Sequence, residues 1–201
     1  DGASAQCLED FAIMRVLPNM KVVCPADELE ARKATRAFAQ TFGPMYMRTS
    51  RAALPVITKP EDVFEIGKAN VLREGKDVSI IACGVMVSES LSAANILAKE
   101  NIDARVINMH TIKPIDAEII IKSAQETQAI VTAEEHQING GLGSAVAEVI
   151  VKKCPAPMEM VAVNDSFGET GTPEQLLQKF HLKDVDIVDA VKKAIKRKNK
   201  I

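Results

Sequence analysis

The segment AIVTAEEHQINGGLGSAVAEVIV, residues 129–151, constrains the fold of this chain more than any other stretch. It opens with an apolar run of β-forming residues at 129–132, followed by the polar triplet Glu134-Glu135-His136. A glycine-rich turn at 140–143 then leads into small and branched residues that predict a helix. Strand, glycine turn and helix in this order form one half of a parallel β-α-β crossover. Because other strand–helix pairs lie on both sides, we expect this strand in the middle of a sheet.

The same segment comes close to a dinucleotide-binding fingerprint. Gly141 and Gly143 match its first two glycines, and Asp165 follows about 20 residues on, where the acidic ribose contact would stand. Val146 occupies the third position, where glycine lets helix and strand pack closely, and its branches would push them apart. We therefore interpret the turn as structural. Nucleotide binding through Gly140 to Ser144 is the alternative.

The composition is that of an ordinary globular protein, with 201 residues, 47% of them hydrophobic and 26% charged. A net charge of −2 produces no strong attraction to nucleic acid or anionic lipid. No apolar run approaches ~18 residues, so we expect no membrane span. The opening residues DGASAQ lack the pattern of a signal peptide. They also lack a methionine, which suggests that the chain begins inside a longer gene product.

The four cysteines, Cys7, Cys24, Cys83 and Cys154, are dispersed and form no CxxC pair. We interpret them as small buried hydrophobic residues in a reducing cytosol, rather than as disulfide partners or zinc ligands. With no Trp, one Tyr and six Phe, the chain lacks aromatic platforms for single-stranded nucleic acid. The expected location is therefore cytoplasmic.

The first part of the chain is expected to contain two helices and two strands. Apolar periodicity predicts a helix at 7–17, and Asp27 with Glu30 three places on predicts a capped helix start that runs to about residue 41. The predicted strands cover residues 21–24 and 45–49. Four elements are too few for an independent core, so this part should belong to a larger α/β domain or pack on its neighbour.

Periodicity disappears at residues 52–62, which we interpret as a linker between two domains, residues 1–58 and 64–201. Beyond it, a strand at 69–73 is joined to a strand at 78–83 by a turn so short that we expect the two to pair antiparallel. Helices and strands then alternate. The other expected strands cover 104–108, 129–133 and 158–163, and the expected helices cover 87–99, 116–125, 142–152, 172–180 and 184–198.

This alternation predicts an α/β fold class. We expect an incomplete α/β domain at the start of the chain, followed by a three-layer domain. The second domain should have a five-stranded, mostly parallel sheet with helices on both faces and one antiparallel strand at its edge.

Two polar stretches lie where open α/β sheets place ligand contacts, at the carboxyl ends of strands. One is the opening loop, with Asp1, Ser4 and Gln6 ahead of a helix. The other is Arg48-Thr49-Ser50-Arg51, after the second strand. A guanidinium beside a hydroxyl suits a phosphate monoester, because its charge is permanent and its fork bonds two oxygens. An arginine that only forms a salt bridge at a domain edge is the alternative.

The remaining polar motifs favour structural roles. His110, His136 and His181 are scattered, with no serine-nucleophile or metal motif beside them. In Glu134-Glu135-His136, adjacent residues leaving a strand point to opposite faces, so we expect hydrogen bonds across the glycine turn rather than a metal site. The basic residues at 192–200 are expected to complement the dipole of the last helix and to remain solvated.

Several motifs, in the right order, resemble the C-terminal half of transketolase, and the resemblance spans essentially the whole chain. They are Asp1-Gly2-Ala3-Ser4-Ala5-Gln6, Leu8-Glu9-Asp10, Met14-Arg15-Val16-Leu17-Pro18-Asn19, Cys24-Pro25-Ala26-Asp27-Glu28-x-Glu30, Met47-Arg48-Thr49-Ser50-Arg51, Thr111-Ile112-Lys113-Pro114-Ile115-Asp116, Glu134-Glu135-His136 and Gly140-Gly141-Leu142-Gly143-Ser144-Ala145-Val146. The resemblance implies that residues 1–58 are the end of a pyrimidine-binding domain and that residues 64–201 are the family's C-terminal domain.

The resemblance also implies an activity, namely transfer of a two-carbon ketol unit between sugar phosphates with thiamine diphosphate and Mg²⁺ or Ca²⁺. In the family the cofactor lies between a pyrophosphate-binding domain and a pyrimidine-binding domain of different subunits in a dimer. The glutamate that activates the cofactor, its stacking aromatic residue and the metal motif all precede the part matched here. We therefore expect no cofactor ligands in this chain, a partner that carries the pyrophosphate-binding domain, and no turnover by the chain alone.

Two substrate-binding residues carry over from the family. Asp1 matches an aspartate that hydrogen-bonds a substrate hydroxyl, and Arg51 matches an arginine that holds the substrate phosphate. Ala5 departs from the pattern, because many relatives have histidine there and some have glutamine. Its methyl group cannot hydrogen-bond, which changes sugar recognition at that point.

Three alternatives remain open at this stage. A 1-deoxyxylulose 5-phosphate synthase shares the opening loop and a similar C-terminal domain, whereas the β-subunit of a 2-oxoacid dehydrogenase needs no phosphate-binding arginine. The Thr49-Ser50-Arg51 sequence favours transketolase. From a different class, the chain could be a non-catalytic dimerisation scaffold that completes a site on another protein.

Overall fold

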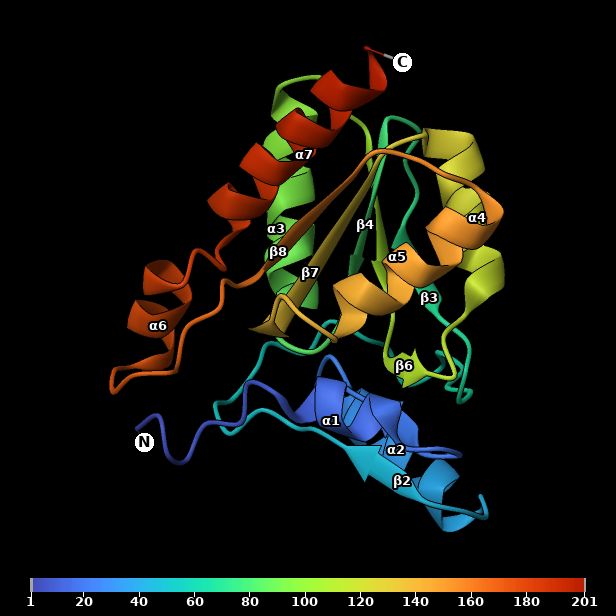
Figure 1. Ribbon diagram of the computed structural model, residues 1–201, viewed down its shortest axis with the longest axis vertical. Helices are drawn as coiled ribbons and strands as arrows, with labels where there is room; N and C mark the ends of the chain where they lie inside the picture. The colour runs from blue at the N-terminus through green and yellow to red at the C-terminus, as the bar shows by residue number, and fades with distance from the viewer. Residues whose placement is uncertain (1, 201) are drawn as a thin grey trace.

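The computed structural model describes residues 2–200 and contains two β-sheets flanked by helices (Figure 1). The larger sheet has five strands in the order β3-β5-β4-β7-β8, and the smaller has three in the order β2-β1-β6. The strands are β1 (Lys21–Val23), β2 (Met45–Met47), β3 (Asn70–Arg73), β4 (Val78–Ala82), β5 (Ala104–Asn108), β6 (Thr111–Lys113), β7 (Ile130–Gln137) and β8 (Met158–Val163). The helices are α1 (Asp10–Val16), α2 (Glu28–Ala39), α3 (Met86–Lys99), α4 (Ala117–Thr127), α5 (Leu142–Lys153), α6 (Pro173–Lys179) and α7 (Asp184–Lys198).

The larger sheet confirms the predicted α/β fold class. Strands β5, β4, β7 and β8 are parallel neighbours, and β3 runs antiparallel at the edge. Every residue of β4 and β5 is buried, as expected for strands with helices on both faces. Strand β7 lies between β4 and β8, so the strand that precedes the glycine turn is an inner strand, as the sequence predicts.

The predicted pairing of the edge strand is wrong. Strand β3 pairs with β5 rather than with β4, which follows it directly in sequence. The short turn does not fold back on itself but wraps around the start of β5, where the amides of Lys76 and Asp77 donate to Asp103 O over 3.1 and 2.9 Å. A Cβ on Gly75 would lie 2.3 Å from the backbone of Ala104, so only glycine lets the turn pass this close.

Helices cover the two faces of the larger sheet in pairs. Figure 1 shows α3 and α7 on one face and α4 and α5 on the other. Alternate strand residues supply two separate cores. The core under α3 and α7 includes Ile80, Ala82, Val106, Val131 and Ala133. The core under α4 and α5 includes Ile81, Ile107, Ile120, Ile130 and Val146.

The smaller sheet contains a strand that the sequence analysis missed. Strands β1 and β2 are parallel, as expected for neighbours joined by helix α2, and β6 adds to the other side of β1 in the antiparallel direction. Strand β6 consists of only three residues, and it comes from a part of the chain far beyond the linker. The first part of the chain therefore shares a sheet with residues from the second part.

Asp27 fixes both the start of α2 and the course of the linker. Its Oδ1 accepts from the Glu30 amide over 2.9 Å, the predicted N-cap. Its carboxylate also accepts from the Ile57 amide (2.8 Å), the Thr58 amide (2.6 Å) and the Thr58 hydroxyl (2.8 Å). Burial alone would raise the pKa of Asp27, but these hydrogen bonds together lower it. A carboxylate with four donors therefore holds residues 57 and 58 of the linker against α2.

Glu30, the other residue of the predicted capped helix start, has a different role. Glu30 does not bond back to Asp27 but accepts from the Ala26 amide over 2.7 Å and from Asn108 Nδ2 over 2.8 Å. Asn108 is the last residue of β5, so this buried carboxyl connects α2 to the larger sheet. Burial raises the pKa of Glu30.

Candidate functional site

A crevice of about 1140 Å³ opens where the two sheets meet. The loop before α1, the end of β2 with the residues that follow it, and the amino-terminal parts of α3 and α6 form its walls. Both predicted polar stretches contribute to it. Among its polar lining residues are Gln6, Asp10, Tyr46, Arg48, Arg51 and Glu135.

Arg51, the predicted phosphate-binding residue, is exposed and lines the crevice together with Thr49 and Ser50. Asp1, the predicted hydroxyl-binding residue, lies outside the described residues. Its loop neighbours Ala5 and Gln6 line the same crevice, and Gln6 Nε2 donates to Glu169 O over 2.9 Å. The structure thus brings the opening loop and the arginine stretch to one cavity.

Arg48 forms the floor of the crevice. Its Nη1 donates to Glu135 O over 2.6 Å, and its guanidinium pairs with Asp10 at 3.5 Å and with the Glu135 carboxylate at 3.3 Å. It also lies over the Phe11 ring, 5.0 Å from the centroid. With only 17% of its side chain exposed, Arg48 is held by protein groups on several sides. Its partners are distant in sequence, so no local pattern identified this role.

Asp10 and Tyr46 complete the floor. The Tyr46 hydroxyl donates to Asp10 Oδ2 over 2.7 Å, so Asp10 binds both the phenol and the guanidinium of Arg48. Burial, and then the hydrogen bond to Asp10, raise the pKa of Tyr46. Burial also raises the pKa of Glu135, and Arg48 opposes that rise. The polar residues at the base of the crevice are therefore paired with one another, and Arg51 lies on its wall.

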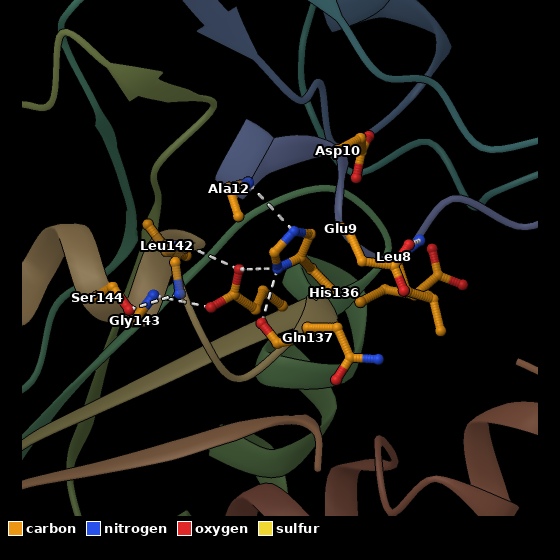
Figure 2. Close-up of polar contacts among 12 residues, drawn as sticks. Leu8, Glu9, Asp10, Ala12, His136, Gln137, Leu142, Gly143 and Ser144 are labelled. Carbon is orange, nitrogen blue, oxygen red and sulfur yellow. Dashed lines mark hydrogen bonds and ion pairs between the residues drawn. The ribbon is translucent and has the colours of Figure 1, made fainter. Parts of the chain in front are cut away.

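The glycine turn beside the crevice is filled by the protein itself. Glu134 Oε2 accepts from the Leu142 amide over 2.7 Å and Oε1 accepts from the Gly143 amide over 2.8 Å, at the start of α5 (Figure 2). A Cβ on Gly141 would lie 2.0 Å from Glu134 Oε2. Burial raises the pKa of Glu134 to about 7, while the two amides oppose the rise. A nucleotide phosphate would have to displace this carboxylate, so the structural interpretation of the turn is favoured.

His136 extends this network to the first part of the chain. Its Nδ1 donates to Gln137 O over 2.7 Å, which leaves Nε2 to accept from the Ala12 amide of α1 over 3.4 Å (Figure 2). The ring stacks on Phe11 with centroids 4.9 Å apart. Burial lowers the pKa of His136, consistent with a neutral ring. Glu134 and His136 belong to β7 itself, which continues to Gln137, so the polar triplet expected after the strand lies within its end.

The other singled-out residues lie elsewhere. His110 stacks on Phe64, and burial lowers its pKa to about 4, whereas His181 is exposed beside Asp186. The basic tail is less solvated than expected, since Arg197 pairs with Glu159 at 2.7 Å and Lys198 donates to Thr127 O over 2.9 Å.

The cysteine prediction holds in part. Cys24 and Cys83 are buried, Cys154 is half-buried, and Cys7 is exposed, contrary to expectation. Across residues 2–200, no three His, Cys, Asp or Glu side chains gather as a metal ion would require. No helix in the same range has the length and apolar character needed to cross a membrane.

The fold and the crevice define the class of this protein. It is an α/β chain in which a small sheet and a five-stranded sheet share a cavity of ligand size, with polar and cationic groups on its lining.

Comparison with known proteins identifies the family. The model of the transketolase C-terminal domain matches residues 67–187, and the model of the transketolase pyrimidine binding domain matches residues 1–57. The chain belongs to the transketolase family, which confirms the resemblance in the sequence.

Individual relatives agree with this assignment. The 6-deoxy-6-sulfo-D-fructose transketolase subunit of a Clostridium strain is 44% identical over 99% of this chain, and human transketolase is 37% identical over 96% of it. A solved structure described as a split gene transketolase, inactive beta4 tetramer, has a TM-score of 0.94 at 50% identity over 97% of this chain. The chain spans 62% of the Clostridium protein, 31% of the human protein and 64% of the solved chain.

Proposed function

We propose that this chain is the C-terminal part of a transketolase that transfers a two-carbon ketol unit between sugar phosphates. In this proposal residues 1–58 are the end of the pyrimidine-binding domain and residues 64–201 are the C-terminal domain. The chain supplies substrate contacts and the dimer scaffold, and it is inactive alone. Membership of the family and the position of Arg51 on the crevice wall support this function.

We assign thiamine diphosphate and its Mg²⁺ or Ca²⁺ to the part of the assembly outside this chain. The residues described here do not fit as the metal's ligands, since none of their His, Cys, Asp and Glu side chains cluster in threes. The proposed partner is a pyrophosphate-binding domain, carried by a separate N-terminal subunit or by a preceding segment, in a homodimeric arrangement in the cytoplasm. A place in the pentose phosphate pathway follows from the sugar phosphates proposed as substrates.

In the crevice, Arg51 would hold the anionic end of the substrate. A guanidinium binds two oxygens of a phosphate at once, and it keeps its charge at every physiological pH. Asp1 would accept a hydrogen bond from a sugar hydroxyl near the reacting carbon. The paired floor of Arg48, Asp10 and Tyr46 would fix the shape of the cavity without changing its charge on binding.

Replacing Arg51 with alanine in the complete assembly is expected to raise the Michaelis constants for xylulose 5-phosphate and ribose 5-phosphate by about 10- to 100-fold. The reason is the loss of a charge-assisted contact to the phosphate, which is made in the ground state as well as in the transition state, so kcat should change much less. Steady-state kinetics with both sugars provide the measurement. Arg36, an exposed arginine of α2, gives the matched control in Arg36→Ala.

Unchanged Michaelis constants in Arg51→Ala would favour the scaffold function over substrate binding. Activity with pyruvate plus glyceraldehyde 3-phosphate, without activity on the pentose phosphates, would instead favour a 1-deoxyxylulose 5-phosphate synthase. Binding of NAD or ATP to the chain would revive the nucleotide alternative at Gly140 to Ser144.

The anionic end of the substrate could also be a sulfonate, and one comparison favours this as a second candidate. The Clostridium relative is named for a sulfonated sugar, and a guanidinium binds a sulfonate through the same paired oxygens. Ala5 lacks a hydrogen-bonding side chain, so recognition at that point differs from the sugar contacts of many relatives. Assaying 6-deoxy-6-sulfofructose as the ketol donor beside xylulose 5-phosphate distinguishes the two substrates.

A further inference from the structure

Two cysteines from different parts of the chain meet beneath the crevice. Cys24 directly follows β1 of the smaller sheet, and Cys83 directly follows β4 of the larger sheet. The Cys24 and Cys83 side chains both line one small pocket. A Cβ on Gly84, the neighbour of Cys83, would lie 2.7 Å from Cys24 Sγ. Cys24 is 7% exposed and Cys83 is 1% exposed, so both are held in the interior.

A small pocket beside this pair shares lining residues with the crevice. Its volume is about 10 Å³, roughly the space of one water molecule. Cys24, Cys83, Gly84, Arg48 and Glu135 are among its lining residues, and Arg48 and Glu135 also line the crevice. The pocket that contains the pair therefore shares part of its lining with the crevice, from which a small neutral oxidant could approach.

The surroundings and the exposure of the pair distinguish the two thiols. Arg48 lines the same small pocket as Cys24 and Cys83, so its guanidinium belongs to the surroundings of the pair. Cys24 is the more exposed of the two residues, at 7% against 1% for Cys83, so an oxidant reaches its sulfur more easily. The neighbouring Cys24 side chain, and then burial, raise the pKa of Cys83, so Cys83 remains a thiol. Cys24 is thus suited to react first and Cys83 to resolve.

We propose that Cys24 and Cys83 form a redox pair that hydrogen peroxide converts reversibly into a disulfide. The Cys24 thiolate attacks one peroxide oxygen, which forms a sulfenic acid and releases hydroxide. The Cys83 sulfur then attacks the Cys24 sulfur, and the sulfenic hydroxyl leaves with the Cys83 proton as water. Two thiols lose two electrons to one peroxide, and the new bond joins the smaller sheet to the larger one.

The test uses the full chain with Cys7 and Cys154 changed to serine, so that only the proposed pair remains. After peroxide treatment the chain is unfolded and its free thiols are labelled with N-ethylmaleimide. The expected result is that both labels are lost, the mass falls by two hydrogen atoms, and a Cys24–Cys83 cross-linked peptide appears without reductant. Dithiothreitol should restore both labels. Adding Cys83→Ser should leave a Cys24 sulfenic acid that dimedone traps, with no cross-link.

Several outcomes would overturn the proposal. Both labels could survive a peroxide dose that oxidises exposed Cys7 in the unmodified chain, or the sulfurs could reach sulfinic acid without a cross-link. A cross-link that forms only in urea would show that it needs unfolding. If the double serine variant does not fold, as judged by circular dichroism, digestion of the unmodified chain without reductant reports the same peptide. Each result is independent of the proposed activity.

Discussion

Replacing Glu134 with alanine is expected to lower the free energy of unfolding by about 4 kcal/mol, because two buried amides lose their acceptor and a cavity is left behind. The amides of Leu142 and Gly143 have no other acceptor in the structure described for residues 2–200, and Glu134 is 1% exposed. Water cannot easily replace the carboxylate at a site packed beneath the start of α5. Urea unfolding followed by far-ultraviolet circular dichroism measures the change.

Glu134→Gln provides a control of nearly the same shape. The amide oxygen can accept from one backbone group, but its NH₂ faces the other, so we expect a loss roughly half that of the alanine variant. A loss below about 1 kcal/mol in Glu134→Ala would contradict the central role of this carboxylate.

Comparison of the unmodified chain with Glu134→Gln also tests the raised pKa of Glu134. Between pH 4.5, the ordinary value, and about 7, the folded protein keeps a proton that the unfolded chain has released. Folding therefore binds a proton, and the contribution of Glu134 to stability is complete below pH 4.5 and falls as the pH rises to about 7. Glutamine does not titrate, so the unfolding free energy of the unmodified chain should fall relative to Glu134→Gln over this range. A constant difference would contradict the raised pKa.

Replacing Asp27 with alanine is expected to lower the free energy of unfolding by about 3 kcal/mol. The variant loses the N-cap of α2 and leaves the amides of Ile57 and Thr58 and the Thr58 hydroxyl without this acceptor. Because these groups hold the linker, residues 52–62 should also become more sensitive to protease. Thermal unfolding and limited proteolysis measure the two effects.

Asp62→Ala is the matched control for Asp27, because the Asp62 carboxylate accepts a single exposed hydrogen bond, from the Lys59 amide in the same linker. We expect it to change stability by less than about 0.5 kcal/mol. The pKa of Asp27 is lowered from 3.8, so its contribution is present above pH 3.8 and is lost as the pH falls through the lower folded value. The difference in unfolding free energy between the unmodified chain and Asp27→Ala should therefore shrink only at strongly acid pH.

Elements whose signal is local could be predicted from the sequence. Strands β5 and β8 and helix α7 have the expected bounds, because alternating apolar runs and capped periodic segments specify each of them within a few residues. The order of the strands in the larger sheet could not be predicted from such local signals. The turn at Gly75 is short enough for a hairpin, and only the passage of Ala104 against it excludes one. Strand β6 was missed because three residues carry no periodicity and their partner, β1, is far away in sequence.

In the candidate site, too, local sequence predicts some features, whereas roles that depend on distant segments could not be predicted. The stretch Arg48-Thr49-Ser50-Arg51 could be singled out because it directly follows a predicted strand, whereas the choice of Arg51 within it came from the resemblance to the family. The role of Arg48, three residues before Arg51, could not be predicted, because its partners Asp10 and Glu135 come from two other segments of the chain. The same holds for Cys24 and Cys83, which look like isolated apolar residues until the two sheets are brought together.

Strand β6 separates two boundaries that usually coincide. The covalent boundary that we propose is the segment 52–62, where a protease could cut a single bond. The boundary in space does not follow this segment. Residues 111–113 are hydrogen-bonded into the smaller sheet, His136 accepts from the Ala12 amide, and Arg15 donates to Gly140 O. We therefore expect the two polypeptides left by a cut in the linker to stay associated. Expressing either one alone would leave β1 or β6 of the smaller sheet without its partner strand.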